Sequence, residues 1–337
     1  MWEKLGQPQI IASLVAAAAS IVAAALSFYF SRSKAKSDAR LDYEYEARKR
    51  LYQECQPIVF QHIAACAALW GRLSSMAARA SEGHLDPGPK SWMHDNYYAR
   101  STVYRIFRVL ALGQLLRSKL TLFDATLDAN IFDKFIVSNI LDDLISSHFD
   151  VAKSAPQIEY APYAADRLAK RVIRKSAGVK PANIYQGLLR GEMQSLVELM
   201  IDDESRNRVM NWNDFDEALK DKKSRVSLHY RPLRELFWDF HPDNRPVLWR
   251  ILVGYSLLSR ALMANPDSPL TPDLMTRARD DVLRTFDHRP PEKRKYQSLL
   301  ESHIDAVSAF IEARLHEGRS AFGAKPGQSR VSAHGAH

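Results

Sequence analysis

The sequence feature that most constrains this chain is the stretch from Gln9 to Phe30, which contains no charged residue. At a helical rise of about 1.5 Å per residue, such a stretch reaches roughly 33 Å, enough to cross the hydrocarbon core of a bilayer. We therefore predict a transmembrane helix over residues 9–30, with residues 1–8 forming a short segment before it.

Two other kinds of segment could produce this pattern. A signal peptide has a basic start, an apolar core of about 7–15 residues and small residues at its cleavage site. Residues 23–25 are alanines and could form that site, but Lys4 is offset by Glu3 and the apolar stretch is too long. A buried core helix seldom stays apolar on every face over such a length. The transmembrane interpretation explains the pattern best.

Basic residues directly after the stretch predict its orientation. Lys and Arg close to a span are retained in the cytoplasm, and residues 31–40 carry a basic excess against Asp38 alone. We expect a single-pass protein of the inner (plasma) membrane, with its N-terminus outside and its C-terminus in the cytoplasm. The same residues could also contact anionic lipid headgroups. They are Arg32, Lys34, Lys36 and Arg40.

Small residues within the stretch are compatible with self-association. Ser13, Ser20 and Ser27 recur every seven residues, with alanines between them. Small residues let two helices approach closely, and serine hydroxyls can form hydrogen bonds across the contact. An alanine-rich span also places small residues on every face by chance, so a homo-oligomer is one of two open readings.

The remainder of the sequence predicts an all-α domain. Only 13 of the 337 residues are glycine, and runs of alternating β-branched residues are missing. Apolar residues between Leu41 and Met76 are spaced three and four apart, as on one face of a helix, and Pro57 is expected to end one helix and begin the next. The predicted parts are a helical stalk (31–56), a helical cytosolic domain (57–318) and a disordered tail (319–337).

A strongly apolar segment from Arg245 to Met263 is predicted to be the central helix of that domain. Arg250, Arg260 and its length of about 19 residues argue against a second membrane span. Thr271 and Pro272 form a cap and first-turn pair, and Gly318 is expected to end the last helix, which begins near residue 291. The other predicted helices cover 91–118, 129–153, 182–203, 213–221 and 229–240.

The two cysteines point to a reducing compartment. Cys55 and Cys66 lie eleven positions apart in a helical pattern, which places them about 16 Å apart along the axis. That separation is too large for a disulfide bond. Reduced thiols agree with a domain in the cytoplasm.

A set of histidines and aspartates resembles the ligands of HD phosphohydrolases, all-helical enzymes in which a divalent metal activates water. Imidazole and carboxylate on facing helices are suitable ligands. The context departs from that family, because the residues after Asp95 differ, and Asp95 could simply cap a helix. The candidate ligands are His62, His94, Asp95 and one of Asp142, Asp143 and Asp150.

The tripeptide His241-Pro242-Asp243 resembles the motif by which J-domain co-chaperones contact their chaperone partner. A J-domain has a basic helix before the tripeptide, whereas Glu235 and Asp239 precede it here. A corner between two helices, with Asp243 or Asn244 as a cap, explains the residues more simply.

A basic stripe is predicted on a short helix after residue 160. At helical spacing its residues share one face, which could meet anionic lipid, a nucleotide or nucleic acid, although such runs usually form a solvated face. Nucleic acid is the weakest of these options, because aromatic residues are not interleaved and the net charge of +8 is modest. The stripe consists of Arg167, Lys170, Arg171 and Arg174.

Three segments resemble a group of uncharacterised bacterial single-span membrane proteins with a helical cytoplasmic region. They are Glu46–Gln61, Tyr97–Arg105 and Pro246–Arg250. The resemblance implies this architecture and a bacterial source, but no reaction. The P-loop, GxGxxG, GxSxG, HExxH and CxxC patterns are absent, and no cofactor is predicted. The prediction is a membrane-anchored helical interaction or scaffold protein with a cytosolic protein partner. The alternative is a membrane-tethered, metal-dependent phosphohydrolase.

Overall fold

The structure is a computed structural model that describes residues 8–94, 96–146, 188, 190–201, 208–238, 240–242, 245–266, 269–286 and 297–321. Over these ranges it contains nine α-helices, a short 3-10 helix and no β-strand. The extended backbone pairs only once there, in an isolated bridge between Ile201 and Val209. The all-α prediction is therefore confirmed.

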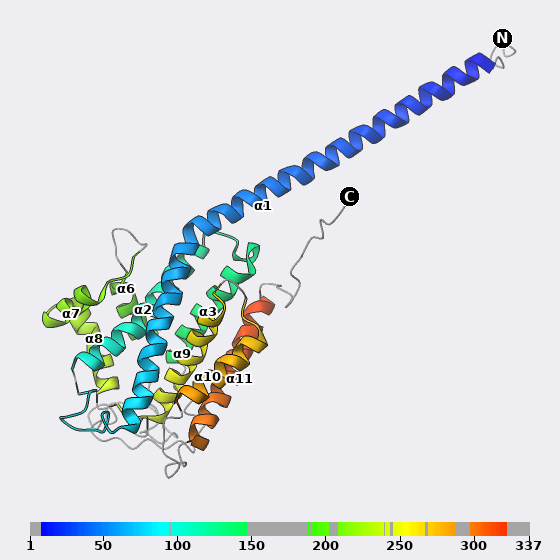
Figure 1. Ribbon diagram of the computed structural model, residues 1–337. Coiled ribbons are helices and arrows are strands. Elements are labelled where there is room, and N and C mark those ends of the chain that lie inside the picture. Colours follow the sequence, from blue (N-terminus) through cyan, green and yellow to red (C-terminus); the bar gives the residue numbers. More distant parts are fainter. Residues whose placement is uncertain are drawn as a thin grey trace, which may run out of the picture. The chain divides into compact units, whose positions relative to one another are not determined.

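The α-helices are labelled in Figure 1. The helices are α1 (Pro8–Ser81), α2 (Tyr97–Leu120), η2 (Ala125–Leu127), α3 (Ala129–Ser146), α6 (Arg190–Leu199), α7 (Trp212–Lys220), α8 (Arg225–Phe237), α9 (Pro246–Ala264), α10 (Pro272–Phe286) and α11 (Gln297–Ala321). The chain divides into two compact units after Tyr52.

Two described helices, α1 and α9, are long and apolar enough to cross a membrane by length and composition. They differ in burial. The apolar window of α1 is 0% buried, and its large side chains, such as Leu14, Ile21 and Phe28, are exposed. The apolar window of α9 is 83% buried within the second unit. The apolar residues of α9 therefore form a core, whereas those near the start of α1 are exposed in the described part of the chain.

The helix break predicted at Pro57 is wrong, because α1 continues through this residue. A proline inside a helix removes one backbone hydrogen bond and crowds the preceding turn. The neighbouring side chains of Ile58 and Val59 are buried, and so is Cys55 on the preceding turn. The burial of these side chains offsets the lost hydrogen bond. A pattern of apolar spacings along the sequence does not reveal this compensation.

Helix α9 forms the centre of the second unit, as predicted, and packs against α3, α10 and α11 (Figure 1). Pro246 occupies its first turn, where no hydrogen bond to the backbone N–H is needed. The Trp249 ring stacks on Phe286 of α10 with 5.4 Å between ring centroids. The Tyr255 hydroxyl donates a hydrogen bond of 2.7 Å to the Leu141 carbonyl of α3.

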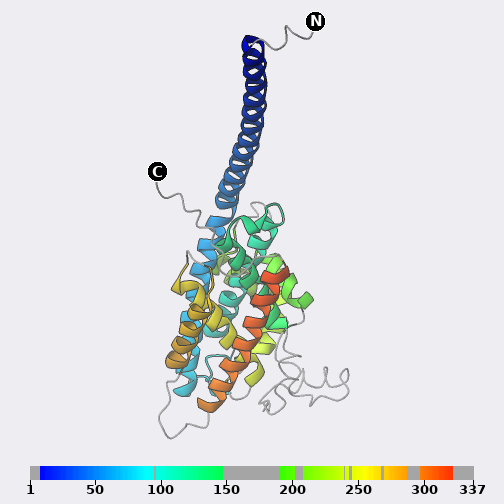
Figure 2. The ribbon, with the colours of Figure 1, turned by 90° about the vertical axis from the view of Figure 1, so that its right-hand side faces the viewer.

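A glycine allows three helices to meet at α9. A Cβ atom at Gly254 would lie 2.7 Å from Cγ1 of Val307 on α11 and 3.1 Å from Cδ1 of Leu144 on α3. Figure 2 shows α11, drawn in orange to red, alongside these helices. Any larger residue at position 254 would push them apart, because interiors are close-packed.

Side-chain caps decide where three helices begin. Asn96 accepts a hydrogen bond of 2.9 Å from the Tyr98 N–H, so α2 begins at Tyr97 and not near residue 91. Asn211 caps α7 by accepting from the Asp214 N–H at 3.0 Å, so α7 begins at Trp212, one position before the predicted start at residue 213. Thr271 accepts a hydrogen bond from Leu274 at the start of α10, as predicted.

The last helix does not end at Gly318 as predicted but continues to Ala321. A Cβ atom at Gly318 would lie 3.0 Å from Cγ2 of Ile136, so this glycine permits close approach of α11 and α3. Arg319, in the next position, forms a 2.7 Å ion pair with the buried Asp133 of α3. Residues 319–321 of the predicted tail are thus helical, and residues 322–337 lie outside the described residues.

Candidate functional site

His62 is buried in α1 and is unsuited to hold a metal ion. It is 1% exposed, and Nε2 has no hydrogen-bond partner among the described residues. Burial, with the positive charges of Arg117 and Lys134, lowers the pKa of His62 to about 4. The imidazole is therefore neutral near pH 7, and the two cations beside it would repel a third.

The other predicted metal ligands do not join His62 in the part of the chain that is described. The His94 ring packs on the Trp238 ring, with 4.1 Å between centroids. Asp95 and Asp150 lie outside the described residues. Elsewhere in those ranges, no group of three or more His, Cys, Asp or Glu side chains is arranged to hold a metal ion.

Replacing His62 with leucine should reduce the loss of stability in acid. The pKa of His62 in the fold lies below its ordinary 6.5, so the fold favours the neutral imidazole. The contribution of this side chain to the free energy of unfolding is complete above pH 6.5 and is lost as the pH falls towards 4. The wild type should lose on the order of 2 kcal/mol more than His62→Leu between neutral pH and about pH 5.

Urea unfolding at several pH values measures this difference. His316→Leu, on an exposed position of α11, is the control and should follow the wild type. Parallel stability curves for the wild type and His62→Leu would contradict the prediction.

His241 and the two cysteines, which the sequence singled out, lie in surroundings that do not form a reactive site in the described part of the chain. His241 lies in the turn between α8 and α9, 3.8 Å from a carboxylate oxygen of Asp86, while Asp243 and Asn244 are outside the described residues. The thiols of Cys55 and Cys66 are free, and burial raises their pKa values to about 11 and 12. They are therefore protonated and poorly reactive.

The basic residues that follow the apolar stretch are exposed on α1. Arg40 forms an ion pair of 2.9 Å with Glu44, one turn further along the helix. Ser20 donates a hydrogen bond of 2.9 Å to the carbonyl of Ala16 in its own helix. The predicted stripe through Arg167, Lys170, Arg171 and Arg174 lies outside the described residues.

The described residues form an open pocket of about 390 Å³, which we call the arginine–aromatic pocket. Three segments form it: the second half of α1, the first half of α2, and the start of α7 with the residues before it. Its lining consists of Ala65, Ala68, Tyr97, Ser101, Tyr104, Arg105, Arg108, Val209, Asn211 and Trp212.

Three aromatic side chains form one wall of this pocket. The Trp212 ring makes edge contacts with Tyr97 and Tyr104, with centroids 5.3 and 5.4 Å apart. The Tyr104 hydroxyl donates a 3.1 Å hydrogen bond to the Met210 carbonyl, which connects α2 to the segment before α7. Tyr97 is 56% exposed and is therefore not a core residue. Its ring lines the pocket instead.

Two arginines make the pocket positive. Arg105 donates one hydrogen bond, of 3.2 Å, to the Ser101 carbonyl, and both Arg105 and Arg108 act electrostatically on the Tyr104 hydroxyl. Arg72 adds a third charge near Arg105; burial first, and then the Arg105 charge, lower the pKa of Arg72. No carboxylate is among the lining residues. The pocket can therefore accept an anionic group.

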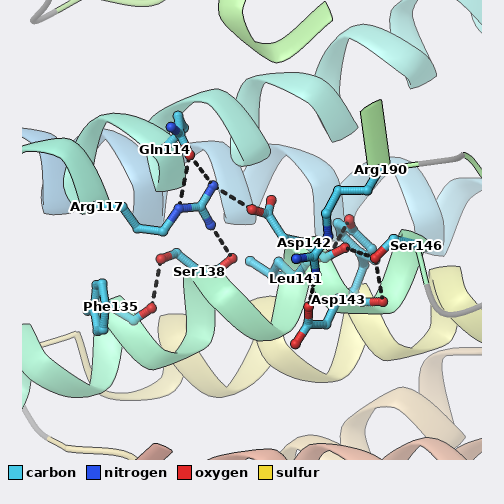
Figure 3. A network of polar contacts seen from close by, with 10 residues as sticks. Gln114, Arg117, Phe135, Ser138, Leu141, Asp142, Asp143, Ser146 and Arg190 are labelled. Carbon is cyan, nitrogen blue, oxygen red and sulfur yellow. Dashed lines mark hydrogen bonds and ion pairs between the residues drawn. The ribbon is translucent and has the colours of Figure 1, made fainter. Parts of the chain in front are cut away.

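A second polar cluster, between α2, α3 and α6, already contains its own counter-charges (Figure 3). Arg117 binds a carboxylate oxygen of Asp142 at 2.5 Å, the Gln114 side chain at 2.6 Å and the Ser138 carbonyl at 2.9 Å. Arg190 reaches Asp143 at 2.5 Å. Because each guanidinium faces a carboxylate, the cluster connects helices and leaves little charge for a ligand.

The sequence contained part of the signal for the arginine–aromatic pocket. Tyr97, Ser101, Arg105 and Arg108 follow steps of four, four and three, which places them on one face of α2. Trp212 lies more than a hundred positions further along the chain, and no spacing rule joins it to that face.

No family model, curated protein or solved structure matches this chain.

Proposed function

We propose that this chain is a membrane-anchored helical interaction protein, with residues 9–30 as its membrane span and the helical domain as its partner-binding part. One observation carries the proposal: the apolar window of α1 is entirely exposed, whereas the similarly apolar window of α9 is 83% buried. A long, fully exposed apolar helix is unfavourable in water and matches the thickness of a bilayer.

The flanking charges support a cytoplasmic domain. Arg32, Lys34 and Lys36 are exposed on α1 directly after the apolar stretch, where the positive-inside rule applies. The free, buried cysteines agree with a reducing compartment. A bacterial inner membrane and a protein partner in the cytoplasm complete the proposal, and the spacing of Ser13, Ser20 and Ser27 supports a homo-oligomer.

The metal-dependent phosphohydrolase receives no support from the described residues. Its candidate ligand His62 faces Arg117 and Lys134, and His94 packs on Trp238. We therefore do not propose this second function.

Introducing charge into the span should release the protein from the membrane. An arginine near the centre of a span costs about 2.5–3.5 kcal/mol on insertion scales. The wild type should stay in the membrane pellet after alkaline extraction, and the double variant Leu14→Arg/Ile21→Arg should move to the supernatant. Leu228→Arg, at an exposed apolar residue of α8, is the control and should stay in the pellet.

The orientation is tested with reporters fused to the C-terminus. A fluorescent reporter that folds in the cytoplasm should be active, and a phosphatase that needs export should be inactive. Extraction of the wild type, or retention of the double variant, would contradict the membrane span. An active phosphatase would contradict the orientation.

A further inference from the structure

We infer that the arginine–aromatic pocket binds a small molecule in which a phosphate monoester is attached to a planar ring, the chemistry of a nucleoside monophosphate. The inference goes beyond the proposed function and does not depend on where the chain is anchored. It stands on three properties of the pocket: two arginines with no carboxylate among the lining residues, an aromatic wall and a suitable volume.

The charge favours a doubly charged anion. Arg105 and Arg108 lie three residues apart on α2, and both line the pocket. On the neighbouring α7, Asp216 is paired with Arg100 at 3.0 Å. Asp214 accepts a 2.7 Å hydrogen bond from the neutral Asn211 side chain and acts on the Tyr104 hydroxyl, so this carboxylate opposes part of the positive charge. A phosphate monoester carries about −1.5 to −2 charges at pH 7 and has three acceptor oxygens. Planar guanidinium groups bind such oxygens in pairs.

A third arginine strengthens the preference for phosphate over a carboxylate. The guanidinium of Arg72 lies over the Tyr98 ring at 4.1 Å. Its Nη1 atom is buried without a hydrogen-bond partner among the described residues. Within the described part of the chain, Arg72 is thus held near Arg105 without an acid acting on it, and its positive charge adds to the potential near the pocket. A single negative charge would leave most of this potential unbalanced.

The aromatic wall favours a ring on the same ligand. Tyr97 and Trp212 meet edge to face and are only partly buried, so their ring surfaces are available to a second planar group. Aromatic side chains stack on nucleobases of every kind. The pocket volume of about 390 Å³ lies within the range of small-molecule sites, roughly 300–1,000 Å³. A ring with one phosphate would use both the wall and the arginines.

Isothermal titration of the full chain in detergent micelles tests the inference with four probes: AMP, UMP, adenosine and inorganic phosphate. AMP or UMP should bind saturably, at least about tenfold more tightly than adenosine or inorganic phosphate. Lack of saturable binding by both monophosphates would overturn the inference. Equal affinity for AMP and adenosine would overturn the role of the arginines, and equal affinity for AMP and inorganic phosphate would overturn the role of the ring.

Two variants separate the two ends of the ligand. Arg108→Ala should weaken binding of the better monophosphate by about tenfold or more. Tyr97→Ala should weaken the same monophosphate and leave the weak binding of inorganic phosphate unchanged. Arg277→Ala removes an exposed arginine of α10 and is the control for net charge.

Circular dichroism establishes that each variant is folded. If Arg108→Ala does not fold, Tyr97→Ala still tests the pocket, because this ring is already 56% exposed. Equal losses in Arg108→Ala and Arg277→Ala would show that only net charge matters. That result, or unchanged monophosphate binding in Tyr97→Ala, would overturn the assignment.

Discussion

Replacing Trp249 with alanine should lower the free energy of unfolding of the helical domain by about 3–5 kcal/mol. The side chain is 6% exposed and packs between Phe286 of α10, at 5.4 Å, and Phe240, at 6.3 Å. Alanine would leave a cavity where α9 meets α10. The neighbours would relax only partly, so the lost contacts add to the lost burial.

Urea unfolding of the full chain in detergent, followed by far-ultraviolet circular dichroism, measures this effect. Leu228→Ala is the control, because this apolar side chain of α8 is 61% exposed, and it should change stability by less than about 0.5 kcal/mol. Equal effects of the two substitutions would mean that Trp249 is not part of a packed core.

Removing one partner of the Arg117–Asp142 pair should also destabilise the domain by about 3–5 kcal/mol. In Arg117→Leu the Asp142 carboxylate would remain between α2 and α3 without its 2.5 Å partner. Its second carboxylate oxygen already lacks a hydrogen-bond partner among the described residues. The double variant Arg117→Leu/Asp142→Leu should recover much of the loss, because no buried charge is left unpaired.

The loss of stability caused by Arg117→Leu should depend on pH. Burial is the main cause that raises the pKa of Asp142 from 3.8 to about 6, and the Arg117 charge acts in the opposite direction. Because the pKa is higher in the fold, the protonated carboxyl stabilises the folded state below pH 3.8. This contribution to the free energy of unfolding is lost as the pH rises through about 6. Without Arg117 the pKa should rise further, so the destabilisation should shrink as the pH falls towards about 5.

Urea unfolding at neutral and mildly acidic pH measures both effects. Lys119→Leu, two positions away on α2, is the control. Its ion pair with the half-exposed Glu54 is worth about 1 kcal/mol or less. If Arg117→Leu cost no more than Lys119→Leu, the buried pair would not hold α2 against α3.

Local rules predicted several elements of this fold well. The position of α9 followed from its apolar composition, and Arg250 and Arg260 distinguished it from a membrane span. In the fold Arg250 donates a 2.8 Å hydrogen bond to His303, and Arg260 pairs with Asp281 at 2.6 Å. Thr271 caps α10, and this could be predicted because capping depends only on residues within one turn.

Rules that use only neighbouring residues failed where those residues agreed equally well with two positions for the start or end of a helix. Asn211 and Asn213 are each followed three residues later by an aspartate, so spacing could not choose between them as the cap of α7. Gly318 has the identity expected just after a helix, but it lies inside α11 against Ile136. Contacts with another helix decided this case, and contacts of that kind do not appear in the residues nearby.

By itself, the sequence determined the helical character of the chain, its uncharged N-terminal stretch and the identity of its central helix, because these follow from composition and spacing within one segment. Only the tertiary structure decided that Pro57 stays inside α1, that His62 faces Arg117 and Lys134, and that Arg105 and Arg108 share a pocket with Trp212. The physical reason is that burial, charge and pocket shape depend on side chains brought together from distant positions, which spacing along the chain does not specify.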